Sequence, residues 1–170
     1  NTQNYVHIVT IEHNDFTLPI NGSETVQCVS AIYQPTPPAV TDACGAAITP
    51  TGPVVGGTYV SCEGTRTYTW TYSDCEGNTH DWTYTFNIDD NTPPTFTRPA
   101  NTTIYADANC NYNASITITG DVTNEADNCS TGLQATFSDQ IVDGTCDGSH
   151  IISRTWSLVD DCGNQAVDQV

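Results

Sequence analysis

The chain has 170 residues, of which 37% are hydrophobic and 14% are charged, and its twenty acidic residues against three arginines give a formal net charge of −17. So acidic a chain repels phosphate groups, which argues against nucleic acid and anionic membranes as partners. We find no signal peptide, no apolar run long enough to cross a membrane, and no motif such as HExxH or a glycine-rich phosphate loop, so we predict no membrane insertion and no enzymatic activity.

Eight cysteines divide the chain into two similar halves. Those of the first half, Cys28, Cys44, Cys62 and Cys75, reappear at offsets of 82, 85, 84 and 87 residues as Cys110, Cys129, Cys146 and Cys162. Their number is even and no CxxC pair is present, which indicates a disulfide framework and not a zinc site. We therefore predict a secreted or cell-surface protein built from tandem repeats.

The ends of the sequence extend the repeat pattern. Asn1-Thr2 and Ile11–Asn14 align at a single offset of 77 with Asn78-Thr79 and Ile88–Asn91. We predict that residues 1–12 are the last strand of a preceding repeat, that residues 13–90 form repeat 1, and that residues 91–170 form repeat 2 with an incomplete final strand. The chain is then a window of a longer array, or a fibre subunit whose residues 1–12 complete the sandwich of a neighbour by donor-strand addition.

Alternating sequence patterns predict the strands of each repeat. In repeat 1 we expect a second strand at 29–34, a sixth strand at 65–73 and a last strand at 79–88, and in repeat 2 the corresponding strands at 113–119 and 149–159. Threonines alternate with aromatic residues from Arg66 to Tyr72, which is typical of a half-buried strand. Trp70 and Trp156 occupy equivalent positions and are predicted core residues. The fold class we expect is all-β, with tandem immunoglobulin-like Greek-key β-sandwiches and two disulfides per repeat.

The strand directions suggest how the cysteines pair. Cys62 and Cys75 flank one predicted strand, which at about 3.3 Å per residue holds them roughly 30 Å apart, whereas a disulfide needs Cα atoms within about 7 Å. The cysteines that precede the second and sixth strands share one pole of the sandwich, and those that follow these strands share the other. We predict the pairs Cys28–Cys62, Cys44–Cys75, Cys110–Cys146 and Cys129–Cys162. Pairing of neighbours in sequence stays open if the sixth strand is broken.

Acidic residues gather where each repeat begins. The predicted ligands in repeat 2 and its linker are Asp89, Asp90, Asn91, Asp127, Asp160 and Asp161, and those at the start of repeat 1 are Glu12, Asn14, Asp42 and Asp74. Carboxylate and amide oxygens are the ligands that calcium prefers, so we predict that calcium locks the joint between successive repeats. The alternative is that Asp and Asn only stabilise turns.

These motifs resemble a known family. Asp89–Pro94, the turn Ala126–Cys129, Arg154-Thr155-Trp156 and Asp161–Asn164 are similar to the hyalin-repeat (HYR) type of immunoglobulin-like module, and more closely to the cysteine-containing versions in large surface and gliding adhesins of Bacteroidetes. The linker also resembles the calcium-binding junction of cadherins. The resemblance implies a bacterial extracellular spacer or adhesive repeat without catalytic residues. Repeat 1 departs from the pattern at His13–Phe16.

The resulting prediction is a segment of a rigid extracellular stalk or fibre whose partners are neighbouring repeats or subunits of the same polymer. A calcium-dependent carbohydrate-binding module is the rival prediction, because β-sandwiches with exposed aromatic residues bind glycans. Trp82 and Tyr105 are the candidate stacking residues for such a surface glycan.

Overall fold

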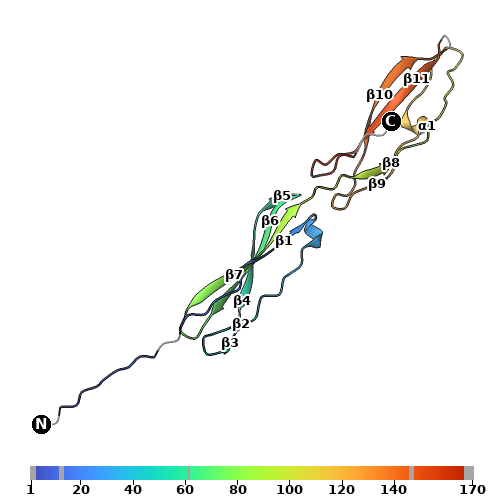
Figure 1. Cartoon of the computed structure of the whole chain (residues 1–170). Coiled ribbons are helices and arrows are strands. Elements are labelled where there is room, and N and C mark those ends of the chain that lie inside the picture. Colours follow the sequence, from blue (N-terminus) through green and yellow to red (C-terminus); the bar gives the residue numbers. More distant parts are fainter. Residues whose placement is uncertain (1–2, 12–13, 61, 146–147, 167–170) are drawn as a thin grey trace. The chain divides into compact units, whose positions relative to one another are not determined.

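The computed structural model describes residues 3–11, 14–60, 62–145 and 148–166. The chain forms two compact units (Figure 1). Unit 1 comprises Asn1–Thr25, Tyr33–Thr58 and Thr65–Asn87, and unit 2 comprises Val26–Ile32, Tyr59–Gly64 and Ile88–Val170. Two segments of the predicted repeat 1 thus belong to unit 2. The boundary at residue 90 that the sequence suggests stays a prediction.

Unit 1 is built on the largest sheet of the molecule. Its strands are β1 (Gly22–Val26), β7 (Thr79–Asp89), β6 (Glu63–Ser73) and β4 (Thr51–Gly56), in that order across the sheet. The short strand β5 (Tyr59–Val60), which belongs to unit 2, pairs with the start of β6. A separate hairpin joins β2 (Val40–Thr41) to β3 (Ala47–Ile48).

The alternation along β6 and β7 places their aromatic residues in the core of unit 1. Trp70 and Tyr72 on β6, and Trp82 and Phe86 on β7, are almost fully buried. The Trp70 and Trp82 ring centroids lie 5.5 Å apart. Because successive side chains of a strand point to opposite faces, the intervening threonines line the other face, where Thr69 and Thr83 share a hydrogen bond of 3.0 Å between their hydroxyls.

Unit 2 contains smaller sheets. β8 (Thr95–Thr97) pairs with β9 (Thr123–Ala126), and β10 (Thr136–Asp143) pairs with β11 (His150–Ser157), both antiparallel. The 3₁₀ turn η1 (Val29–Ala31) and the one-turn helix α1 (Ile116–Thr119) complete its elements. The core consists of Phe96, Val122, Trp156, Leu158 and Ala166. Trp156 is 3% exposed and Trp70 is also 3% exposed, which confirms both predicted core positions.

Arg154 connects the β10–β11 sheet of unit 2 to the segment around α1. Its guanidinium forms two hydrogen bonds of 2.7 Å to the Asp139 carboxylate across the β10–β11 pair. It also donates to the Ala114 carbonyl and to the Thr119 hydroxyl, and it lies 4.0 Å from the centroid of the Phe137 ring. The side-chain hydrogen bond from Arg154 lowers the pKa of the Asp139 carboxyl, so the pair stays ionised.

The all-β prediction is confirmed, and the predicted strands at 65–73, 79–88 and 149–159 correspond to β6, β7 and β11. Two predicted strands are wrong. Residues 29–34 contain the turn η1, and residues 113–119 contain α1. In the second case hydroxyl groups satisfy local backbone groups, since Thr119 Oγ1 donates to the Ser115 carbonyl at 3.1 Å, and such local bonds compete with a strand ladder. The Greek-key topology stays a prediction. In the described residues, no helix has the length and apolar character needed to span a bilayer.

Candidate functional site: a disulfide and carboxylate cluster in unit 2

Two disulfides lie together in unit 2. Cys28 bonds Cys129 and Cys62 bonds Cys162, with Cα atoms 5.2 and 5.3 Å apart, as disulfide geometry requires. Each bond spans about one repeat, with sequence separations of 101 and 100 residues. Both therefore join a cysteine of repeat 1 to a cysteine of repeat 2.

The predicted pairs Cys28–Cys62 and Cys129–Cys162 are wrong. The prediction treated each repeat as a closed sandwich that bonds its own cysteines. Instead, Val26–Ile32 and Tyr59–Gly64 pack with the residues of repeat 2 in one compact unit, which brings Cys28 and Cys62 to the turns of that repeat.

The other four cysteines are Cys44, Cys75, Cys110 and Cys146. Cys44, Cys75 and Cys110 are exposed, and the predicted Cys44–Cys75 bond is not among the disulfides of the described residues. Cys146 lies outside the described residues, so the predicted Cys110–Cys146 pair stays a prediction.

Aspartate-centred turns hold Cys129 and Cys162, the two cysteines of repeat 2 that form these disulfides. The Asp127 Oδ1 atom accepts hydrogen bonds from the backbone N–H groups of Cys129 and Ser130, at 2.8 and 2.7 Å. In the second turn, Asp160 Oδ1 accepts from the N–H groups of Cys162 and Asn164, both at 2.8 Å. A short acidic side chain that accepts bonds from the backbone two residues ahead fixes such a turn, so each aspartate sets the position of its cysteine.

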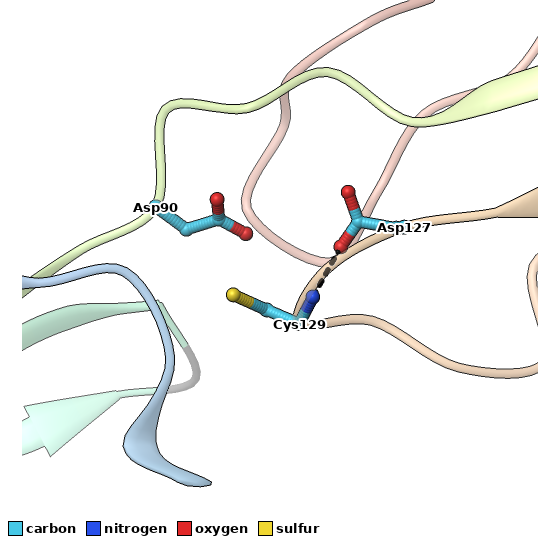
Figure 2. A group of neighbouring side chains, drawn as sticks. All are labelled: Asp90, Asp127 and Cys129. Atoms are coloured by element: carbon cyan, nitrogen blue, oxygen red, sulfur yellow. Dashed lines mark hydrogen bonds between the residues drawn. The ribbon is translucent and has the colours of Figure 1, made fainter. Parts of the chain in front are cut away.

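Asp90 lies between these turns, directly after β7, and is 6% exposed. Figure 2 shows its carboxylate directed toward Asp127 and Cys129. Its Oδ1 atom accepts a hydrogen bond of 3.2 Å from the side-chain amide of Asn128, and its backbone carbonyl accepts one of 2.9 Å from the amide of Asn164. Its Oδ2 atom is 3.3 Å from Cys162 Sγ. A disulfide sulfur carries no proton, so this last contact is not a hydrogen bond.

The cluster places negative charge beside the disulfides. Burial raises the pKa of the Asp127 carboxyl, but the N–H groups of Ser130, Cys129 and Asn128 outweigh burial and bring the pKa below its ordinary value. Disulfide exchange proceeds by attack of a thiolate anion. The carboxylate of Asp90, in contact with Cys162, therefore repels the species that would reduce the bond.

The same carboxylates are the best candidate ligands for a cation. Asp90, Asp127 and Cys129 offer atoms within 4.8 Å of one another, and so do Asp90, Asp160 and Cys162. The cysteines are oxidised and supply no thiolate, which leaves oxygen ligands that suit calcium. The Oδ2 atom of Asp127 is buried and has no hydrogen-bond partner among the described residues, which makes it the oxygen most available to a cation.

The structure brings only some of the predicted ligands together. Asp89, Asn91 and Asp161 are exposed and lie outside these groups. Near the start of repeat 1, Asp42 and Asp74 each accept backbone hydrogen bonds within their own turns and belong to no group of ligand-type side chains in the described residues. Asn14 is exposed, and Glu12 lies outside the described residues.

The two candidate stacking residues differ in exposure. Trp82 is buried, and its indole N–H donates to the Ile20 carbonyl. Tyr105 is 88% exposed. It lies on a cleft of about 730 Å³ along β11, which Tyr112 and His150 also line. In the sheet of unit 1, β7 pairs along one edge of β6. β11 is the predicted equivalent of β6, and within the described residues it pairs only with β10, so we interpret the cleft as an open strand edge. Stacking of a glycan on Tyr105 stays a prediction.

Part of the chain also matches a known protein family. Residues 16–88 match the family model of the HYR-like domain with 4 cysteines. The chain matches no curated protein and no solved structure. The match supports the HYR resemblance for these residues. HYR-like domains are extracellular repeats of an adhesion type and are not enzymes, and the two disulfides fit an oxidising compartment.

The HYR-like segment contains Cys28, Cys44, Cys62 and Cys75, and two of these four bond partners outside the matched residues. Sequence reasoning also missed the amides that complete the cluster. Asn128 donates to Gln27 Oε1 at 2.8 Å, and Asn164 donates to Asp160 Oδ2 at 2.9 Å. A signal was present, because Gln27 and Asn128 each directly precede a bonded cysteine.

Proposed function

We propose that this chain is a structural or adhesive segment of an extracellular multi-repeat protein, in which paired disulfides make successive repeats into a rigid stalk. The single observation that carries the proposal is that Cys28–Cys129 and Cys62–Cys162 each join one sequence repeat to the next. Bonds inside a repeat would stabilise that repeat alone. Bonds across repeats hold the segment together under load.

The course of the backbone supports this role. The chain passes from one unit to the other five times, and two of the passages lie inside the strands β6 and β7. A single flexible linker would cross once. Continuous strands resist bending because their backbone hydrogen bonds continue along the sheet. The HYR-like match of residues 16–88 supports the same adhesion-type class.

The experiment that tests the stalk measures the distribution of distances between the two units. Fluorescent probes are placed at two exposed positions, Val54 on β4 and Ile141 on β10. We expect a narrow distribution for the oxidised chain and a broad one after reduction or after replacement of the four bonded cysteines by serine. Cys75→Ser, which removes an exposed cysteine outside the cluster, is the matched control and is expected to change nothing. A distribution that is already broad in the oxidised chain would show a flexible tether.

We also propose that calcium binds at Asp90, Asp127 and Asp160. The buried, unpartnered Oδ2 atom of Asp127 supports this assignment. The test is calorimetric titration of the oxidised chain with calcium. Asp127→Asn keeps the turn, because its side-chain oxygen still accepts the backbone bonds, and is expected to weaken binding. Asp143→Asn, at a carboxylate 94% exposed, is the control. Binding that Asp127→Asn leaves unchanged would place the cation elsewhere.

Donor-strand assembly into fibres and binding of surface glycans stay predictions from the sequence. Residues 3–11 are extended, and Tyr5, Val6, Ile8, Val9 and Ile11 among them are exposed. Deletion of these residues, followed by measurement of the oligomeric state, tests the first. Titration with glycans tests the second.

A further inference from the structure

The cleft beside β11 lies where unit 1 has a strand. In the sheet of unit 1, β7 lies between β1 and β6. In unit 2 the counterpart of β6 is β11, with Trp156 at the position of Trp70. The counterpart of β1 is residues 104–108, which precede Cys110 as β1 precedes Cys28. Residues from both counterparts line the cleft, namely Ile104, Tyr105, Ile152 and Trp156. The cleft therefore takes the place of a strand equivalent to β7.

The turn that follows β11 supports this correspondence. In unit 1 the Asp74 N–H donates to the Asn78 carbonyl at 3.1 Å, which closes the turn between β6 and β7. In unit 2 the Asp160 N–H donates to the Asn164 carbonyl at 3.0 Å. Each member of the second pair follows its counterpart by 86 residues, from the differences 160 − 74 and 164 − 78. The two turns are equivalent, so a shift of 86 residues carries the pairing of β6 with β7 over to β11.

Side chains give the register of β6 against β7. Two hydrogen bonds join facing residues of the pair, Thr69 to Thr83 at 3.0 Å and Thr71 to Asp81 at 2.6 Å. Trp70 therefore lies opposite Trp82, and their ring centroids are 5.5 Å apart. Within the described residues, β11 has no strand on the side that corresponds to β7.

Residues 3–11 have the sequence pattern of the missing strand. At the offset of 77, the buried positions of β7, which are Trp82, Phe86 and Ile88, correspond to Tyr5, Val9 and Ile11. The segment is extended and exposed, and it belongs to no strand in the described residues. Its alternating apolar side chains thus face solvent in the single chain.

The alternative occupant of the cleft is the chain's own continuation, whose Gln165 forms a bridge with Val159 just beyond β11. At the offset of 86, however, the sequence has Asp168 where β7 has Trp82. Residue 168 lies outside the described residues, so only its place in the sequence bears on this choice. A carboxylate is costly to bury among apolar side chains, whereas the tyrosine of residues 3–11 suits the same position.

We propose that residues 3–11 of a second copy of this chain bind in the cleft of unit 2, as a strand between β11 and residues 104–108. In the register of unit 1, Tyr5 of the second copy lies opposite Trp156 and Val9 lies opposite Ile152. The open edge of β11 supplies backbone hydrogen bonds, and the cleft receives every second side chain, as in other cases of strand addition. This contact joins copies without a covalent bond, so it goes beyond the disulfide joint proposed above and does not depend on it.

The first test compares two neighbouring residues that the proposal orients oppositely. Val9 faces the cleft and Ile8 faces away from it, yet in the single chain both are exposed, at 70 and 81%. Val9→Asp should weaken association more than about tenfold relative to Ile8→Asp, because it places a carboxylate against Ile152. Sedimentation equilibrium over a concentration series measures the association, and the oxidised chains are first treated with iodoacetamide so that no thiol links two copies. Equal association of the two variants would overturn the proposal, and so would an unchanged chain that is monomeric at every concentration.

The second test locates the added strand. A chain with benzoylphenylalanine in place of Tyr5 is mixed with an isotope-labelled unchanged chain, irradiated, digested and analysed by mass spectrometry. We expect links from position 5 to the labelled peptide that contains Trp156. Links confined to the probe's own chain, links to labelled peptides outside the cleft, or no links in a mixture that associates would each contradict the proposed pairing.

The outcome is separable from that of the proposed stalk. Peptide mapping of the same samples reports whether Cys28–Cys129 and Cys62–Cys162 have formed. A monomeric chain that contains both bonds would refute strand addition and leave the covalent joint intact. An associating chain that lacks them would refute the joint alone.

Discussion

The disulfide topology predicts how far the unfolded chain can be stretched. The two loops closed by Cys28–Cys129 and Cys62–Cys162 overlap in sequence, so the shortest covalent path between the termini uses only one bond. That path is shorter than the full chain by 101 residues through the first bond and by 100 through the second. Either bond alone therefore limits the extension almost as well as both.

Removal of one bond should thus leave the stretched length nearly unchanged, whereas removal of both should release about 101 residues. A fully extended chain spans about 3.5 Å per residue, so the double removal adds roughly 350 Å. The assay is single-molecule stretching with handles at both termini, in a background where Cys44, Cys75, Cys110 and Cys146 are serine. The variants are Cys28→Ser with Cys129→Ser, Cys62→Ser with Cys162→Ser, and all four together.

The pairing expected from the sequence gives a different result. Cys28–Cys62 and Cys129–Cys162 would close separate loops of 34 and 33 residues, from the differences 62 − 28 and 162 − 129. Each of the two paired substitutions takes one cysteine from both of these loops, so each variant would release 34 + 33 = 67 residues, which is roughly 235 Å at about 3.5 Å per residue. Lengthening of this size in the Cys28→Ser, Cys129→Ser variant or in the Cys62→Ser, Cys162→Ser variant would refute the overlapping topology.

Three further predictions concern charge. Asp90→Asn should speed reduction of Cys62–Cys162 by dithiothreitol about fivefold, because a carboxylate about 4 Å from an attacking thiolate contributes ~1 kcal/mol of repulsion in water. Asp143→Asn is the control, and equal reduction rates in the unchanged chain and in both variants would exclude electrostatic protection. Arg154→Lys should lower the free energy of unfolding by about 2 kcal/mol, because lysine cannot reproduce the paired bonds to Asp139. If denaturant unfolding gives free energies for the two chains that differ by less than about 0.5 kcal/mol, the Arg154–Asp139 pair does not stabilise the fold. Stability should fall in acid, because N–H donors lower the pKa values of Asp74, Asp107 and Asp127 in the folded chain. The stabilisation from these groups is present above their unfolded pKa values of about 4 and is lost as the pH falls through the lowered values. A melting temperature that is the same at neutral pH and well below pH 4 would contradict this.

Local patterns in the sequence predict the strands that carry the core. The alternation of threonine with tyrosine and tryptophan in β6 predicts which of its side chains are buried, because successive side chains of a strand face opposite sides. Trp70 and Trp156 follow from the same rule. Residues 115–119 alternate equally well, yet Ile116–Thr119 form α1, since hydroxyl groups of Ser115, Thr117 and Thr119 bond within the segment.

The disulfide pairing depends on tertiary structure, so local sequence patterns do not predict it. Spacing correctly places Cys28 and Cys62 at one end of repeat 1, but it does not say whether the nearest thiols belong to the same repeat or to the next. Packing of Val26–Ile32 and Tyr59–Gly64 with repeat 2 decides that question. The six predicted ligands of this joint all lie in the cysteine turns or in the linker, namely Asp89, Asp90, Asn91, Asp127, Asp160 and Asp161. The structure groups Asp90 with Asp127 and with Asp160, whereas Asp89, Asn91 and Asp161 are exposed, because sequence position alone does not fix which side chains turn inward.

The most direct test of disulfides between successive repeats is peptide mapping of the oxidised 170-residue chain without reduction. The structure predicts peptides that contain Cys28 linked to Cys129 and Cys62 linked to Cys162. Recovery of Cys28 linked to Cys62, and of Cys129 linked to Cys162, would show instead that each repeat closes on itself, and it would remove the covalent joint on which the proposed stalk depends.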